Sequence, residues 1–117
     1  MIDVSRRIAG VELGGTKCIA VIAQGRNILS REQWPTTNDP GSTLAAVAAW
    51  LDLEQAERGF EALGIASFGP LGLDPARADY GQILNTPKPG WSGANVVAAL
   101  RGKRATLPPK KHGNIPL

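Results

Sequence analysis

Short apolar runs separated by glycines mark the first third of the chain. Residues 8–13 and 18–23 are such runs, and the pair Gly14-Gly15 lies between them. Two strand-like runs divided by a glycine pair predict a β-hairpin. A further turn signal precedes a third strand, which is predicted over residues 27–34. The pattern therefore predicts three consecutive antiparallel strands.

A helical period follows the third strand. Asp39 suits an N-cap and Pro40 suits the first helical position. Apolar residues then recur at helical spacing, with Trp50 widening the stripe: Leu44, Val47, Ala48 and Leu51. Gly59 is expected to end this helix. The apolar residues 62–68 predict a buried strand, which can pair in parallel with an earlier strand because a helix precedes it.

The residue composition changes after this strand. Gly, Pro, Asp and Asn dominate residues 69–93, with one strand-like piece at 82–85, and a helix is expected to begin over residues 95–100. A loop of this length within a compact domain is usually functional. The order β-β-β-α-β-α predicts an α/β lobe with a mixed sheet. Residues 101–117 contain three prolines, two glycines and five basic residues, and they predict a disordered tail beyond a lobe of residues 1–100.

Composition narrows the class of protein. The 117 residues suffice for one domain, and 43% hydrophobic with 20% charged residues is typical of a globular protein. No apolar run approaches the ~20 residues of a membrane-spanning helix, and residues 1–7 do not resemble a signal peptide. A single cysteine excludes a disulfide framework and favours a cytoplasmic location. The net charge of +3 is concentrated near the C-terminus, so no nucleic-acid partner is expected.

The strongest candidate for chemistry is the segment 10–17. Glycines at a tight turn let a phosphate approach backbone N–H groups, Thr16 adds a hydroxyl, and Lys17 adds a positive charge. Glu12 could hold a magnesium ion directly or through water. The P-loop motif is excluded because Thr and Lys stand in reverse order and a strand follows. On spacing alone, an ordinary hairpin turn with an incidental lysine stays open.

Two later segments offer polar groups. Residues 67–70, Ser-Phe-Gly-Pro, follow a buried strand, and ligands of α/β sheets collect beyond the carboxyl ends of such strands. Asn85, Thr86 and Lys88 could contact sugar hydroxyls in a loop stiffened by prolines, with Trp91 as a packing anchor. A plain strand exit and a rigid surface loop remain the alternatives for these two segments.

Together the three segments resemble the ROK family of sugar kinases, and specifically its fructokinase branch. The glycine hairpin is similar to the family's first phosphate motif, with Glu12 where many actin-like kinases carry aspartate. The combination of residues 67–70 with Tyr80-Gly81 and with Thr86-Pro-Lys-Pro-Gly-Trp91 resembles the fructokinase branch, and so does Pro35-Thr-Thr37. The resemblance covers residues 8–100.

This resemblance implies an actin-like, ribonuclease H-like ATPase fold of two lobes, of which this chain holds the N-terminal one. It implies magnesium-dependent transfer of the γ-phosphoryl group of ATP to a hexose hydroxyl, with fructose favoured. Glu12 would hold the metal. The nucleotide would be bound by Gly14, Gly15, Thr16 and Lys17. The sugar would be bound by Ser67, Gly69, Pro70, Asn85, Thr86, Lys88 and Gly90.

The sequence departs from the family pattern after residue 100. The family's base is an aspartate shortly after the helix near Asn95, but no Asp or Glu follows Asp79 in this chain. No catalytic residue is therefore assigned. The family's zinc site cannot form from Cys18 and His112 alone, and the second phosphate motif and the adenosine-binding segment are absent. A truncated, frame-shifted or fragmentary kinase without activity of its own is expected, whereas full-length relatives are expected to be homodimers.

Two rival hypotheses remain. The chain could be a non-catalytic module that binds sugar or nucleotide without turnover. It could also resemble the family's transcriptional regulators, which carry a helix-turn-helix domain before the sugar-binding lobe. The glycine hairpin begins within about ten residues of Met1, so such a domain has no room there. The regulator hypothesis is accordingly the weaker of the two.

Overall fold

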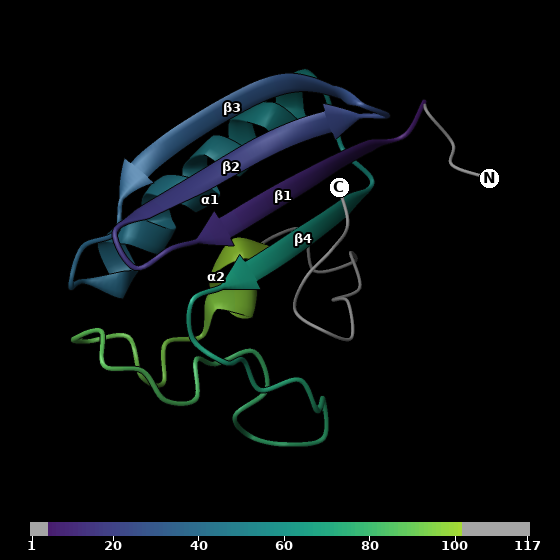
Figure 1. The fold of residues 1–117 in the computed structure, drawn as a ribbon. Coiled ribbons are helices and arrows are strands. Elements are labelled where there is room, and N and C mark those ends of the chain that lie inside the picture. The colour runs from purple at the N-terminus through teal and green to yellow at the C-terminus, as the bar shows by residue number, and fades with distance from the viewer. Residues whose placement is uncertain (1–4, 102–117) are drawn as a thin grey trace.

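The computed structural model describes residues 5–101. A four-stranded sheet carries two helices on one face, and the strand order is β3-β2-β1-β4 (Figure 1). The three N-terminal strands are β1 (Arg7–Leu13), β2 (Lys17–Gln24) and β3 (Asn27–Pro35). They pair in antiparallel succession, as the short apolar runs between turn signals predict. The tail expected from residue 101 lies outside the described residues, apart from Arg101 itself.

The helix α1 (Pro40–Glu57) connects β3 to the fourth strand, β4 (Ala62–Ser67). Its start is set by Asp39, whose carboxylate accepts a hydrogen bond from the amide of Gly41 at 3.1 Å. Its end is set by Gly59, which has a φ of 74° and donates its N–H to the Glu54 carbonyl. β4 then pairs in parallel with β1, so the predicted crossover is confirmed.

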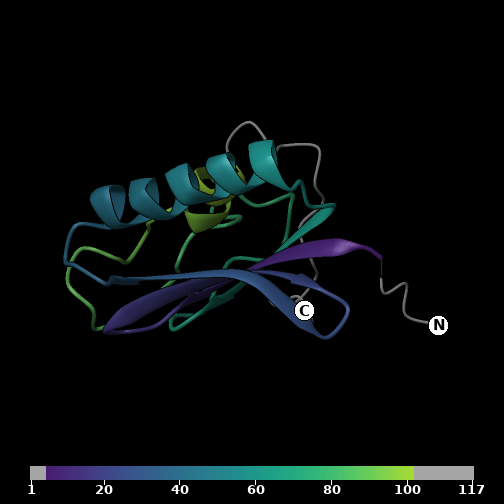
Figure 2. The ribbon, with the colours of Figure 1, turned by 90° about the horizontal axis from the view of Figure 1, so that it is seen from above.

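The core lies between the helices and one face of the sheet (Figure 2). Alternate residues of β1 and β2 point into it: Ala9, Val11, Leu13, Cys18, Ala20 and Ile22. Leu44, Val47 and Leu51 of α1 cover them, and Trp50 packs edge-on against Trp34 with ring centroids 6.0 Å apart. No helix within residues 5–101 is long and apolar enough to cross a membrane.

The other face of the sheet carries no helix from the described part of the chain (Figure 2). Small and β-branched residues, together with Glu12, line a shallow groove of about 360 Å³ on this face: Gly10, Glu12, Ile19, Val21, Gly64 and Ala66. Gly10 and Gly64 are direct partners in the parallel pair of β1 and β4, so no side chain covers the backbone there. This face is referred to below as the open face.

A long loop, residues 68–95, connects β4 to the second helix, α2 (Val96–Arg101). The strand expected at residues 82–85 does not form, because its partners are single bridges between Leu71 and Ile83 and between Gln82 and Asn95. The helix expected near Asn95 is present, and the side chain of Asn95 accepts a hydrogen bond from the amide of Ala98 at 2.9 Å. Ile83 and Trp91 are fully buried, so this loop extends the core.

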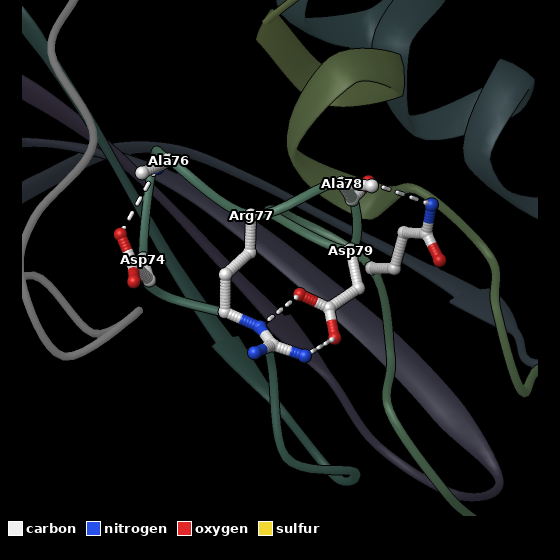
Figure 3. Close-up of polar contacts among 6 residues, drawn as sticks. Asp74, Ala76, Arg77, Ala78 and Asp79 are labelled. Atoms are coloured by element: carbon white, nitrogen blue, oxygen red, sulfur yellow. Dashed lines mark hydrogen bonds and ion pairs between the residues drawn. The ribbon is translucent and has the colours of Figure 1, made fainter.

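Part of the long loop leaves the core and returns to it. Gly81 donates its N–H to the carbonyl of Gly72 at 2.8 Å, and this contact closes the base of the excursion formed by residues 72–81. At its exposed tip Arg77 pairs with Asp79, and Asp74 accepts a bond from the amide of Ala76 (Figure 3). The hydrogen bond from Arg77 lowers the pKa of Asp79, but exposed ion pairs contribute little to stability.

Candidate functional site

The candidate site lies at the end of the sheet where β1 and β4 terminate and the long loop begins (Figure 1). The first component is the glycine turn, residues 14–17, which joins β1 to β2. The amide of Gly14 donates to the carbonyl of Lys17 at 2.9 Å and closes the turn. A Cβ on Gly14 would lie 2.6 Å from this carbonyl oxygen, whereas a Cβ on Gly15 would meet nothing within 4 Å. Gly14 is therefore required by the turn, and Gly15 leaves open space beside it.

The turn presents unused donors to solvent. Gly15, Thr16 and Lys17 are exposed, and within residues 5–101 no hydrogen bond uses the amide of Gly15 or the hydroxyl of Thr16. Backbone N–H groups without internal partners, beside a hydroxyl and an ammonium group, are a donor set that suits phosphate oxygens. The residues present at this turn therefore fit a nucleotide's phosphates.

Glu12 precedes the turn on β1 and is exposed on the open face. No cluster of three acidic, histidine or cysteine side chains occurs anywhere in residues 5–101. A single carboxylate still fits magnesium, because this ion is commonly held by one or two carboxylates, by water and by substrate phosphates. Glu12 is thus suited to a metal shared with a nucleotide.

Thr36 fixes the position of the glycine turn from behind. Its amide donates to the carbonyl of Thr16 at 2.9 Å, and its hydroxyl donates to the carbonyl of Gly14 at 2.8 Å. The Sγ atom of Cys18 lies 3.2 Å from the same hydroxyl. Burial raises the pKa of the Cys18 thiol, although the bond with Thr36 and the charge of Lys88 oppose this shift. Cys18 is accordingly a neutral packing residue at physiological pH.

The strand exit at residues 67–70 forms the second component. Ser67 is half-buried, and its hydroxyl oxygen accepts a bond from the amide of Gly69 at 3.4 Å. Gly69 is buried, and a Cβ there would lie 2.8 Å from the Cγ2 atom of Ile83. Its lack of a side chain lets the long loop pack closely. Pro70 is exposed, so of these residues Ser67 and Pro70 are the ones a ligand can reach.

The third component is the polar part of the long loop. Asn85 is exposed, and Thr86 is half-buried with its amide bonded to the hydroxyl of Ser92 at 3.2 Å. The hydroxyl oxygen of Thr86 also accepts the amide of Lys88 at 3.2 Å, which shapes the following turn. The amide group of Asn85 is therefore the side chain in this part that is most available to a sugar.

Residues 88–91 pack against residues 36–38, and this contact is called the loop seam below. The ammonium group of Lys88 donates to the carbonyl of Thr36 at 3.2 Å, and the indole N–H of Trp91 donates to the carbonyl of Thr37 at 2.7 Å. Gly90 has a φ of 84°, and a Cβ there would lie 2.4 Å from the carbonyl oxygen of Asn38. Of the expected sugar-binding residues, Lys88 and Gly90 thus contact residues 36–38 in this structure.

Sequence reasoning missed the part that Thr36 plays. The segment Pro35-Thr-Thr37 entered only as part of a resemblance, and nothing in its pattern indicated contacts with residues 50 or more positions away. Three hydrogen bonds to backbone carbonyls run through or beside it, and they link the glycine turn to the polar part of the long loop. The sugar contacts of these residues stay predictions.

Comparison with known proteins gives the family. The model of the ROK family matches residues 8–108. A fructokinase of Zymomonas mobilis is 42% identical over 94 residues, which are 78% of this chain and 31% of that protein. A fructokinase of Pediococcus pentosaceus is 35% identical over 97 residues, which are 82% of this chain and 32% of that protein. The chain therefore spans about a third of the length of these curated relatives.

Solved structures agree with this match. A ROK family glucokinase from Streptomyces griseus, in complex with glucose and AMPPNP, has a TM-score of 0.66 and 26% identity, covering 88% of this chain and 31% of that one. A ROK hexokinase from Thermus thermophilus has the same score and identity, covering 88% of this chain and 33% of that one. The mixed sheet with its helices is thus part of the actin-like ATPase fold of sugar kinases. The chain belongs to the ROK family.

Proposed function

We propose that this chain forms the part of an ATP-dependent hexose kinase that holds the nucleotide's phosphates and the sugar, with fructose as the favoured substrate. The observation that carries the proposal is the exposed glycine turn, whose Gly15 amide and Thr16 hydroxyl have no acceptor within residues 5–101. Its position beside the polar long loop gives donor and acceptor sites at one end of the sheet. The fructokinase names of the relatives support the choice of sugar.

On the nucleotide side, each residue has a distinct role. Gly15 gives a phosphate room to approach the backbone, Thr16 donates from its hydroxyl, and Lys17 offsets negative charge. Glu12 would hold magnesium, which neutralises charge on the transferring phosphoryl group. Gly14 keeps the turn closed and so supports the donors next to it.

On the sugar side, Ser67, Thr86 and Asn85 offer hydroxyl and amide groups that can donate to and accept from sugar hydroxyls. Thr86 and Asn85 stand on a loop that Trp91 holds by complete burial and by its bond to Thr37, and Ser67 ends β4 just before this loop. Phosphoryl transfer depends mainly on positioning and charge stabilisation, so a rigid loop beside the turn suits it. For a full-length kinase of this kind we propose a cytoplasmic location and a homodimer. The family's zinc site would be formed by other residues, not by those named here.

A second candidate is ligand binding without turnover. The observation that favours it is the absence of any Asp or Glu after Asp79 in the sequence, where the family's base is expected. Loss of a general base typically costs ~10²–10⁴-fold in rate. The nucleotide and sugar contacts proposed above would survive that loss, so binding and catalysis need separate measurements.

A chimera tests the proposed function. Residues 8–100 replace the matching segment of the Zymomonas mobilis fructokinase, and ADP formation is followed with magnesium, ATP and fructose, glucose or mannose. Fructose is expected to give the highest kcat/KM. Asn85→Ala is expected to raise the KM for fructose at least ~5-fold, with the KM for ATP within ~2-fold, because one lost ligand hydrogen bond is worth ~1 kcal/mol or more.

The parent fructokinase serves as the control for chimera formation, and circular dichroism checks that the chimera is folded. A folded chimera that prefers another hexose would contradict the assignment of fructose. A folded chimera without turnover on any hexose would contradict the kinase proposal as a whole.

A further inference from the structure

The loop seam joins two parts of the site that lie far apart in sequence. Trp91 and Gly90 anchor it, since the indole is completely buried and the backbone of Gly90 lies against the carbonyl of Asn38. Both contacts hold residues 88–91 against residues 36–38. Lys88 adds a third contact of a different kind, because its flexible side chain brings a charged group to the carbonyl of Thr36.

Thr36 forms hydrogen bonds with both sides. Toward the glycine turn it uses its amide, bonded to the carbonyl of Thr16, and its hydroxyl, bonded to the carbonyl of Gly14. Toward the long loop it uses its carbonyl, which accepts from Lys88. Thr36 is buried, so water does not readily replace the partners of these hydrogen bonds. Every polar group of Thr36 is thus engaged between the turn and the loop.

The chemistry of Lys88 makes this contact unusual. An ammonium group is strongly hydrated, and a lysine on a loop gains most by pointing into water. Lys88 is instead half-buried with its ammonium group on a backbone carbonyl. A hydrogen bond from a charged donor is stronger than one from a neutral donor, so it holds the acceptor carbonyl more firmly.

We propose that Lys88 is a positioning residue that sets the glycine turn relative to the sugar loop through Thr36. The proposal rests on the function proposed above and deepens it, because it assigns Lys88 to alignment of the two substrates and not to binding of the sugar. Transfer requires the acceptor hydroxyl and the phosphoryl group at a defined separation, and small displacements cost large factors in rate. A tie between the two loops maintains that separation.

The first test uses the complete 117-residue chain without ligands, and it measures amide hydrogen exchange by NMR. Lys88→Met removes the charge and the donor but keeps most of the side-chain volume. Exchange at the amides of Thr36 and Gly14 is expected to become ~10-fold faster, because the acceptor end of Thr36 is released. The amide of Glu61, bonded to Arg7 at the far end of the sheet, is expected to change less than ~2-fold.

Two variants act as controls. Arg77→Met removes a positive charge from the same long loop, where Arg77 pairs with Asp79, and it is expected to leave all three amides unchanged. Lys88→Arg keeps a charged donor and is expected to hold the exchange rates within ~3-fold of the original chain. Equal acceleration at Glu61 in Lys88→Met, or no effect of this change at Thr36 and Gly14, would overturn the proposed tie.

A double variant tests the route through Thr36. Thr36→Val keeps the backbone amide and carbonyl and removes the hydroxyl that donates to Gly14. In this background Lys88→Met is expected to change exchange at Gly14 by less than ~3-fold, because the link to the turn is already weakened. A full ~10-fold effect of Lys88→Met in both backgrounds would show a different route and would overturn the assignment of Thr36.

Kinetics of the chimera separate positioning from sugar binding. Lys88→Met is expected to lower kcat at least ~10-fold while the KM values for fructose and ATP change less than ~3-fold. An increase confined to the KM for fructose would make Lys88 a sugar ligand and would overturn the proposal. The exchange experiment needs no substrate, so it tests the contact between Lys88 and Thr36 independently of activity. A chimera without turnover would therefore count against the proposed function, whereas the NMR result alone decides the positioning role.

Discussion

Gly14 and Gly15 are adjacent in sequence, yet their surroundings differ. Gly14 faces the carbonyl of Lys17 so closely that any side chain must move the backbone, whereas Gly15 faces open space. Neither residue has a positive φ, so conformational freedom is not the reason for glycine at either position. The structure therefore separates a glycine that forms the turn from one that leaves room for a ligand.

Alanine at each position should reveal this division. Gly14→Ala is expected to lower the free energy of unfolding of the 117-residue chain by ~1–3 kcal/mol, the usual cost of overpacking. Gly15→Ala is expected to change it by less than ~0.5 kcal/mol, as for an unstrained surface position. Urea unfolding followed by tryptophan fluorescence measures both values.

In the chimera, the effects of Gly15 substitution should appear in activity. Gly15→Val is expected to reduce kcat/KM at least ~100-fold, the scale of lost transition-state charge stabilisation, because its side chain fills the phosphate's approach. Near-normal turnover by Gly15→Val, or equal loss of stability in the two alanine variants, would contradict the separation of roles.

At this scale the sequence predicted residue types better than residue partners. The exposed donors at Gly15 and Thr16 follow from a glycine turn between strands, which is a local pattern. The contact between Lys88 and Thr36 spans 52 positions, and no local period encodes it. A lysine beside prolines suggested a ligand group, but its direction is set by how the long loop packs.

The helix α1 illustrates what local signals do determine. Asp39 and Pro40 predicted its first turn, and the structure confirms the cap through the bond from the amide of Gly41 to Asp39. The amide of Asp39 and the hydroxyl of Thr37 also bond at 3.1 Å, which places this helix start directly beside the loop seam. The cap therefore orients both the helix and residues 36–38.

Removal of the cap should be measurable. Asp39→Ala is expected to destabilise the chain by ~0.5–2 kcal/mol, because the first-turn amide of Gly41 loses its acceptor. Asp74→Ala is the matched control, since Asp74 accepts a comparable bond from Ala76 in an exposed turn away from any helix. Equal effects of the two changes on the urea midpoint would argue against a special role for the cap.

Helices and strands were predictable where a regular apolar pattern extended over many residues or where glycine and proline marked the ends of an element. The three antiparallel strands follow from apolar runs between turn signals, the 18-residue helix from a helical stripe, and the parallel fourth strand from an apolar run flanked by glycines. Residues 82–85 failed as a strand because they meet two different partners at single positions. A four-residue piece with two apolar residues cannot specify such partners by itself.

At the scale of the whole molecule, the activity expected of the chain depends on how much of the length of its relatives it spans. It spans 31% and 32% of two fructokinase relatives, and its sheet keeps one open face in the described residues. Parallel strands are normally covered on both faces. The 117-residue chain therefore carries the proposed turn and loop within about a third of its relatives' length.

We expect the purified 117-residue chain to form no ADP in a fructose-dependent manner above background. The physical reason is that transfer needs a held nucleotide, a placed metal, a positioned acceptor and a proton acceptor together. No Asp or Glu after Asp79 can serve as that base. A coupled ADP assay with magnesium, ATP and fructose measures this, with the chimera as the positive control. Clear turnover would mean that another group or a partner chain completes the site.

The closed base of the excursion at residues 72–81 makes it separable from the rest of the lobe. Gly72 and Gly81 are joined directly by a hydrogen bond, so the chain enters and leaves at almost the same point. Most of the residues between them are exposed to solvent. An epitope, a fluorophore-binding peptide or a metal tag could occupy this cassette without altering the path of the backbone on either side. The lobe thus carries its own attachment point for a probe, outside the core and away from the loop seam.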